Sequence, residues 1–513
     1  MKGQMQENVV QDAIEKTGFG KFNLKISSLG ALIYANAVIN ILSIGYVLPA
    51  AMCDFEMTTI DKGRIAIAPV LGSCFGSLFW GFLADLKGRR ISLMSALFLQ
   101  GKSDILISLV SSYWALLSFK FLSGFAIIGE ISLVFSYVGE FQPARCQKKI
   151  LSWLSLVMVA GLIIVPLLAW AIIPLQFEYR RHYFFFRSWN LFVLVCAIPA
   201  EILGIWLIFC PETPKYLAES GQTGKLLKVL TDMYVENIRG TPEEFYRTLE
   251  NSEYPALIEL ANSCANKSTS KEEKAPSKKK LCTMLKDFKK QRQNVFKAPY
   301  LKRLVVLCIC LFCTASSFYS LLMWFPELFQ RFAHFEALHP NQTASVCSIS
   351  NKNSATNTTM IKNSFDCVQE INTSVYRSAL WQGLTTLIPN ILLPLLVDKL
   401  GFRFFAVTLL GTSVFVTSGL YFAKSYMENV ILSCIFLAVM STSLSVMYSF
   451  LVILFPTNIR VFASTISVFT SRIGTIFGNV TFTYLIDDYC TILIVTIIAQ
   501  LLLAATLSLT LRA

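Results

Sequence analysis

The chain has 513 residues, of which 54% are hydrophobic and only 15% are charged. A soluble protein usually carries about 25% charged residues, so this composition indicates a polytopic membrane protein and excludes an ordinary soluble domain. The formal net charge of +13 does not indicate a nucleic-acid partner, because the basic residues lie between apolar stretches, where membrane topology explains them.

The N-terminal residues 1–25 are polar and mixed in charge. They lack the apolar stretch of a cleavable signal peptide. We therefore expect residues 1–25 to form a cytosolic tail, and the first apolar stretch to act as its own insertion signal.

Twelve apolar stretches are long enough to cross a bilayer core of about 30 Å. Six of them precede a polar segment at 211–301, and six follow it. The sequence therefore predicts an all-α membrane protein with twelve transmembrane helices in two pseudo-symmetric six-helix bundles, at 26–210 and 302–513, joined by a cytosolic central loop. The expected spans are 26–50, 64–84, 91–110, 113–139, 148–172, 189–210, 302–328, 377–397, 402–423, 428–455, 459–485 and 490–511.

The second part of the central loop is strongly basic. From Lys278 to Arg303 it carries ten Lys or Arg residues against one acid, Asp287. A basic block beside a span is typical of the cytosolic side of a membrane. We interpret it as a determinant of topology, with contact to anionic lipid as the alternative. Both termini are then expected in the cytosol.

The segment 331–376 then lies on the opposite, luminal or extracellular side. It contains three Asn-x-Ser/Thr sequons, at Asn341, Asn357 and Asn372, which predict glycosylation. It also contains two cysteines, for which we expect a Cys347–Cys367 disulfide. Two further cysteines, Cys53 and Cys490, fall on the same side, so four cysteines leave three pairings open.

One charged turn recurs in both halves. Gly81 to Arg90 joins the second and third spans and contains Asp85, Gly88, Arg89 and Arg90. The stretch from Asp398 to Arg403 repeats the Asp-x-x-Gly-x-Arg pattern between the eighth and ninth spans. A matching signature in two six-span halves indicates a duplicated transporter architecture.

These motifs carry a resemblance to a known family. Gly81–Arg90 resembles the signature loop of the major facilitator superfamily. Three more stretches are similar to its motifs after spans four, six and ten, namely Tyr137–Arg145, Pro211–Leu217 and Phe455–Arg460. With the sequon-bearing loop, the pattern looks most like the synaptic vesicle glycoprotein and organic-ion branch, which is similar to sugar porters. The resemblance implies a secondary active transporter of a small organic solute, organic ion or sugar-like, that works by alternating access.

The resemblance also implies a cytosolic gate. In it, Asp85 packs at the start of a helix in the other half, Arg89 and Arg90 pair with acids such as Glu140, and Glu212 engages Arg145. Charge-assisted hydrogen bonds of this kind can hold one side of a transporter shut. The alternative is that these charges only fix the topology. The expected gate residues are Asp85, Gly88, Arg89, Arg90, Glu140, Arg145, Glu212, Asp398, Arg403 and Arg460.

Ionisable residues inside the predicted spans are candidates for the solute pathway, because charge is costly in a bilayer. Glu130 lies in the middle of span four, and it is either a cavity carboxylate or a neutral group bonded between helices. Arg472 in span eleven either meets an anionic solute, neutralises a carboxylate such as Glu130, or extends to the cytosolic face. Lys120 has a similar ambiguity. Polar or aromatic candidates are Asn36, Asn40, Tyr319, Trp381, Gln382 and Asn390.

Some features separate this chain from its relatives. Asn36 and Ile39 stand where relatives often carry acids, and Ile453 replaces an expected Glu. These lost carboxylates favour a rival interpretation, a vesicle or plasma-membrane glycoprotein that transports weakly or not at all and acts by binding a partner. An enzyme is disfavoured, because all three His residues fall on luminal segments. We expect a monomer in the bilayer of the plasma membrane or a vesicle, with a small-molecule solute and no cofactor, metal or nucleic acid.

Overall fold

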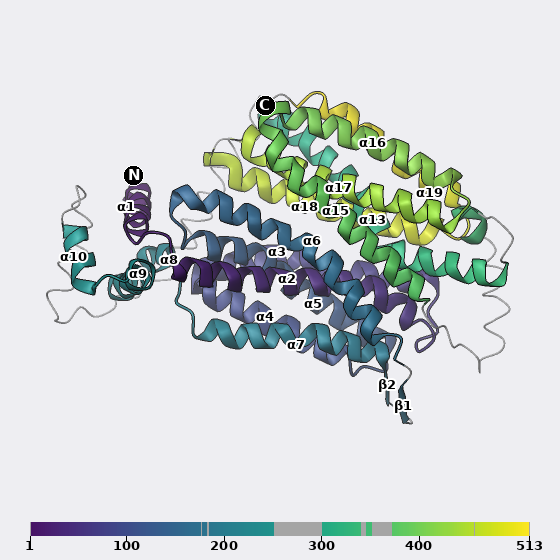
Figure 1. The fold of residues 1–513 in the computed structure, drawn as a ribbon, viewed down its shortest axis with the longest axis horizontal. Helices are drawn as coiled ribbons and strands as arrows, with labels where there is room; N and C mark the ends of the chain where they lie inside the picture. Colours follow the sequence, from purple (N-terminus) through teal and green to yellow (C-terminus); the bar gives the residue numbers. More distant parts are fainter. Residues whose placement is uncertain are drawn as a thin grey trace.

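The structure is a computed structural model that describes the backbone of residues 2–175, 177–181, 184–250, 300–339, 345–350, 372–455 and 457–511. Its long helices form two groups that lie side by side (Figure 1). The N-terminal half contains α2 (Lys21–Ala50), α3 (Thr59–Lys87), α4 (Arg89–Ile107), α5 (Tyr113–Gly139), α6 (Ala144–Ile172) and α7 (Ser188–Ile208). The C-terminal half contains α13 (Tyr300–Leu338), α15 (Thr373–Leu400), α16 (Phe402–Phe422), α17 (Tyr426–Leu454), α18 (Thr457–Leu485) and α19 (Cys490–Ser508).

Shorter elements lie outside these bundles. Helices α1 (Lys2–Lys16), α8 (Pro214–Glu219), α9 (Thr223–Ile238) and α10 (Pro242–Glu250) gather beside one end of the N-terminal half (Figure 1). At the other end, strands β1 (Glu178–Arg181) and β2 (Phe184–Arg187) pair as an antiparallel hairpin, with Glu178 opposite Arg187. The hairpin is the one departure from the predicted all-α fold in the described part of the chain.

Ten of the long helices are apolar and long enough to cross a membrane. The other two, α4 and α18, carry more polar and charged residues, among them the buried Asp104 and the half-buried Arg472. The chain is therefore a multi-pass membrane protein in which charged side chains lie inside the bundle.

Two glycines allow the sharp turns that the duplicated motif predicts. Gly88 joins α3 to α4 with φ +101°, and Gly401 joins α15 to α16 with φ +79°. Both values favour glycine. At Gly88 a Cβ would also meet the Glu212 carboxylate, which would have to move. We call the end of the bundle with these turns the motif end, and the opposite end, at Asn372, the sequon end.

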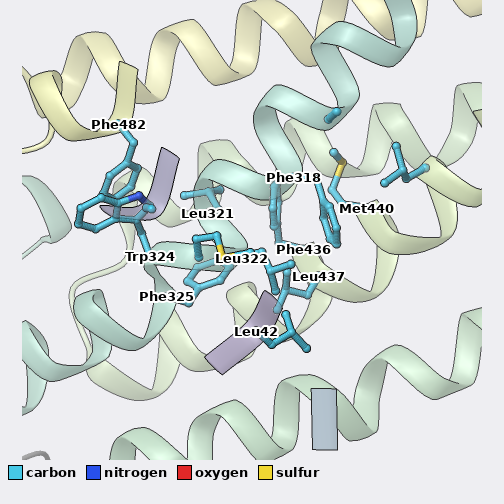
Figure 2. Packing of buried hydrophobic residues seen from close by; sticks show 14 of the residues in the cluster. Leu42, Phe318, Leu321, Leu322, Trp324, Phe325, Phe436, Leu437, Met440 and Phe482 are labelled. Carbon is cyan, nitrogen blue, oxygen red and sulfur yellow. The ribbon is translucent and has the colours of Figure 1, made fainter. Parts of the chain in front are cut away.

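The C-terminal half is built around α13. Phe318, Leu321, Trp324 and Phe325 of α13 pack with aliphatic and aromatic side chains of α17 and α18 (Figure 2). Trp324 stacks on Phe482 with a ring-centroid distance of 4.8 Å. Burial of such large apolar side chains fixes α13 in place, which positions the polar residues that α13 presents to the N-terminal half.

Candidate solute pathway

A buried polar network occupies the interior of the N-terminal half. Asn36 of α2 donates hydrogen bonds to Gln100 Oε1 of α4 at 2.9 Å and to Glu130 Oε2 of α5 at 3.1 Å. Glu130 is fully buried. Asn40 donates to the carbonyl oxygen of Cys196 on α7 at 3.2 Å. Asn36 and Glu130 therefore link helices within one bundle and do not line the cavity described below.

An ion pair extends this network. Lys120 Nζ lies 3.6 Å from Asp104 Oδ1, and both side chains are at most 5% exposed. The other oxygen of Asp104 accepts a hydrogen bond from Gln100. Because a buried charge without a partner is costly, Asp104 explains how α5 holds a lysine inside the membrane.

A cavity of about 60 Å³ lies between the two halves. Helices α2, α3 and α5 line it from one side, and α13 and α18 from the other. Its polar lining residues include Asn40, Lys120, Tyr319, Arg472 and Asn479, and none of the described lining residues is acidic. A separate cavity inside the C-terminal half is lined mainly by apolar residues, with Thr417 and Asn429 as exceptions, which suits a polar solute less well.

Arg472 is the cation of this cavity that lacks a counter-ion. Its Nε atom is buried without a hydrogen-bond partner, and no ion pair joins it to a carboxylate among the described residues. Tyr34 and Tyr319 lie close enough to Arg472 to interact with it electrostatically, and Tyr448 lies close enough to interact with both of these tyrosines. Of the alternatives for Arg472, neutralisation of Glu130 does not occur in this structure, because Glu130 bonds to Asn36 inside the N-terminal half.

The α15 candidates lie elsewhere. Gln382 donates to Ser433 Oγ at 2.9 Å, and Asn390 donates to Ser441 Oγ at 3.1 Å, so both amides join α15 to α17. Trp381 is 56% exposed on the outside of α15. Of the expected solute-pathway residues, the structure places Asn40, Lys120, Tyr319 and Arg472 around the cavity.

A cluster of four charged side chains joins the halves at the sequon end. Lys62 Nζ of α3 lies 2.9 Å from Glu327 Oε1 of α13. One turn further along α13, Arg331 contacts Glu327 at 3.2 Å and Asp487 at 2.8 Å. Arg331 also donates to Thr59 Oγ1 of α3 at 3.3 Å. We call Lys62, Glu327, Arg331 and Asp487 the inter-half ion cluster.

The sequence analysis missed this cluster and Asp104. The available signal was the presence of acids inside apolar stretches, which marks them as candidates by default. Asp104 lies within the expected span 91–110, and Glu327 lies at the end of 302–328, four residues before Arg331. That i, i+4 spacing places Glu327 and Arg331 on one helix face, but their partner Lys62 is distant in sequence.

The motif end carries several of the expected gate contacts, all within the N-terminal half. Arg89 Nε lies 3.2 Å from Glu140 Oε1, and Arg89 also lies 3.6 Å from Asp85. The Arg90 backbone N–H donates to Glu212 Oε1 at 3.0 Å, and the Arg90 side chain donates to the Cys210 carbonyl at 2.8 Å. These contacts attach the start of α4 to the ends of α5 and α7.

One expected gate contact is wrong. Glu212 bonds to the backbone of Arg90 and of Thr213, whereas Arg145 is exposed. Burial raises the pKa of Glu212, although these two hydrogen bonds oppose the shift. Arg403 is exposed, and the side chains of Asp398 and Arg460 lie outside the described residues. The predicted contact of Asp85 with the other half stays a prediction.

The sequon end corrects the expected disulfide. Cys347 is bonded to Cys490 at the start of α19, not to Cys367. Cys53 is disulfide-bonded as well. Asn372 is exposed and is the N-cap of α15, since its side-chain oxygen accepts from the Ser374 N–H at 3.0 Å. The predicted glycosylation sites Asn341 and Asn357, and the predicted disulfide partner Cys367, lie outside the described residues.

The comparisons with known proteins agree on the fold. A structure of the xylose transporter XylE from E. coli, in a partially occluded inward open conformation, superposes with a TM-score of 0.65 at 14% identity, covering 96% of this chain and 98% of that chain. An inward open structure of the same protein gives a TM-score of 0.64. The protein therefore has the twelve-helix major facilitator fold.

The family follows from the sequence comparison. Residues 36–336, more than half of the chain, match the family "Sugar (and other) transporter", and the chain belongs to it. Synaptic vesicle glycoprotein 2B of Mus musculus is 30% identical over 332 residues, 62% of this chain and 47% of that protein. Synaptic vesicle glycoprotein 2C of Mus musculus is 30% identical over 321 residues. The chain spans about half the length of the curated relatives it matches.

Proposed function

We propose that this protein is a secondary active transporter that moves a small organic solute across a membrane by alternating access. The observation that carries the proposal is the cavity between the two halves, which contains Arg472 and Lys120 beside tyrosine and asparagine side chains. A solute site between two helix bundles, near the middle of the membrane, is what alternating access requires. Membership of the transporter family supports the same conclusion.

The lining favours an organic anion as the solute. Lys120 is already neutralised by Asp104, whereas Arg472 has a buried nitrogen without a partner. An arginine binds a carboxylate or phosphate through several charge-assisted hydrogen bonds. Tyrosine hydroxyls near Arg472 add donors, and their rings add apolar contact area. We therefore assign Arg472 as the anchor of the anionic group.

Alternating access also needs closures that open in turn. We propose that the motif end and both termini are cytosolic and that the sequon end faces the lumen or the extracellular space. The inter-half ion cluster then closes the luminal side, because Lys62 and Glu327 belong to different halves and lie 2.9 Å apart. The Arg89–Glu140 and Arg90–Glu212 contacts hold the cytosolic ends of the N-terminal half as one body.

An uptake assay tests this function. The purified protein is reconstituted into liposomes and offered a panel of radiolabelled organic anions, organic cations and sugars. We expect uptake of at least one anion and, in the Arg472→Gln variant, an affinity about 10- to 100-fold weaker, because a hydrogen bond to a charged group is lost. Arg472→Lys keeps the charge and retains part of the affinity.

Arg247→Gln is the matched control, since Arg247 is exposed on α10, outside the two bundles. Uptake of a sugar or a cation with no effect of Arg472→Gln would contradict the anion assignment but not transport. If the folded, correctly oriented protein takes up no solute of the panel, the rival interpretation of a partner-binding membrane glycoprotein replaces transport. For either function, we propose that the protein resides in the plasma membrane or in a vesicle membrane.

A further inference from the structure

A groove at the motif end lies apart from the solute cavity. It is bounded by the first turns of α2, the α3–α4 turn, the end of α7 and helix α9. Asn237 of α9 fixes one wall, because its side chain accepts from the Phe22 N–H at 3.0 Å and donates to Asn23 Oδ1 at 2.7 Å. The groove is therefore a fixed feature at the level where the bundle meets the cytosolic helices.

Basic side chains dominate the groove. Its lining contains Lys25, Lys87, Arg90, Lys225 and Lys228 against three acids. Two of these acids already have partners. Glu212 accepts from the Arg90 and Thr213 backbone, and Glu236 lies 3.8 Å from Lys25.

Several donors of the groove remain available for an anion. Lys87 and Lys228 are exposed, and neither forms an ion pair with another described residue. The Nε atom of Arg90 is buried without a hydrogen-bond partner. The groove therefore offers an anion unused donors from Lys87, Lys228 and Arg90.

An exposed apolar strip leads out of the groove along α7. Phe209 and Ile208 line the groove and are 82% and 45% exposed. The strip continues along the membrane-facing side of the same helix through Ile205, Ile202 and Ile198, which are exposed as well. Trp206 lies near its cytosolic end, as is typical of a side chain at the membrane interface.

We propose that this groove binds the headgroup of an anionic phospholipid of the cytosolic leaflet, with an acyl chain lying along α7. A free anion needs only the basic residues, whereas a phospholipid also covers the apolar strip that begins at Phe209. Lys87 and Lys228 contact the headgroup from opposite walls, and Arg90 lies at its floor. The site rests on the proposed orientation but not on the identity of the solute.

The test uses the full chain in nanodiscs, in phosphatidylcholine alone and with about one fifth phosphatidylserine, and native mass spectrometry counts the lipid that stays bound. We expect wild-type protein to retain phosphatidylserine and the double variant Lys87→Ala/Lys228→Ala to retain it about 30-fold less, since each lysine near an anionic headgroup contributes about a factor of five. Phe209→Ser tests the apolar strip separately, and we expect it also to weaken retention.

Lys149→Ala/Lys399→Ala is the matched control, because both lysines are exposed near the motif end and neither lines the groove. Thermal unfolding in phosphatidylcholine alone checks that every variant folds. Equal retention by wild type and the groove variant would overturn the proposal, as would equal loss in the control. Retention of inorganic phosphate in neutral nanodiscs, without effect of Phe209→Ser, would assign the groove to a free anion instead.

Discussion

The charged residues inside this membrane protein differ in role, and the role of each residue depends on the residues that it contacts. Glu130 and Lys120 lie on the same helix, α5, and both are buried. Glu130 is held by an amide from Asn36 and serves packing within one bundle. Lys120 is held by Asp104 and also reaches the solute cavity. A charged residue in a membrane span is thus a reasonable candidate for a role in transport. Whether it has that role or only holds helices together can be judged from the residues that surround it.

The Asp104–Lys120 pair gives a prediction at this scale. Asp104→Asn leaves the buried ammonium of Lys120 without a counter-ion, which costs about 3–5 kcal/mol. We expect a strongly lowered thermal unfolding midpoint for the purified protein. The double variant Asp104→Asn/Lys120→Met removes both charges and should recover a large part of the loss. If the double variant were no more stable than Asp104→Asn alone, the two charges would not be coupled.

At the scale of elements, α3 and α13 are the helices that the inter-half ion cluster joins at the sequon end. Lys62, Glu327 and Arg331 are buried and Asp487 is 25% exposed, so solvent screens these pairs little. The four charges neutralise one another, so they can be separated only if water replaces their partners. Separation of the two halves would let water reach them. These properties suit the proposed role of the cluster as a reversible closure of the sequon end.

We expect Lys62→Gln to favour opening at the sequon end. Val70 lines the cavity, so a Val70→Cys variant reports on access through its labelling by a membrane-impermeant maleimide from the luminal side. We predict labelling about tenfold faster with Lys62→Gln, which corresponds to about 1.4 kcal/mol of lost interaction between the halves.

Arg64→Gln is the control, because the ion pair of Arg64 with Asp61 lies within α3 and is partly exposed. The same proteins without the introduced cysteine report the background from native thiols. Unchanged labelling with Lys62→Gln would show that the ion cluster does not control the closure.

For the whole molecule, the orientation in the membrane is the property on which the gate assignments depend. Asn372 tests it, because only a sequon on the luminal side is glycosylated. We predict that Ser374→Ala removes one glycan, seen as a loss of apparent mass that glycosidase treatment abolishes. Unfolding should be unaffected, because the capping bond uses the backbone N–H of Ser374.

Asn372→Gln separates the glycan from the cap. It removes the same glycan and, in addition, the N-cap of α15, which costs about 1 kcal/mol and should lower the unfolding midpoint relative to Ser374→Ala. The wild-type protein should be expressed in cells that glycosylate other proteins. If Asn372 then carried no glycan, this result would argue against the proposed orientation.

The sequence alone determined the class of the molecule and its order of elements. Long apolar stretches, the charged turns at Gly88 and Gly401, and the sequon-bearing loop are local features. Such features can be recognised from the order of residues along the chain. The positive φ at both glycines is an example, because no other residue type adopts it so readily. The twelve helices and the transporter family follow from such signals.

Only the tertiary structure decided the partners. Asp104 with Lys120, Lys62 with Glu327, and Cys347 with Cys490 join residues that are far apart along the chain. Membrane helices associate through close packing and interhelical hydrogen bonds rather than through a simple apolar stripe, so the linear pattern of residues does not reveal which faces meet. The same physical reason separated Glu130 from Arg472, although both looked like cavity residues: one faces the interior of its own bundle, and the other faces the space between the two.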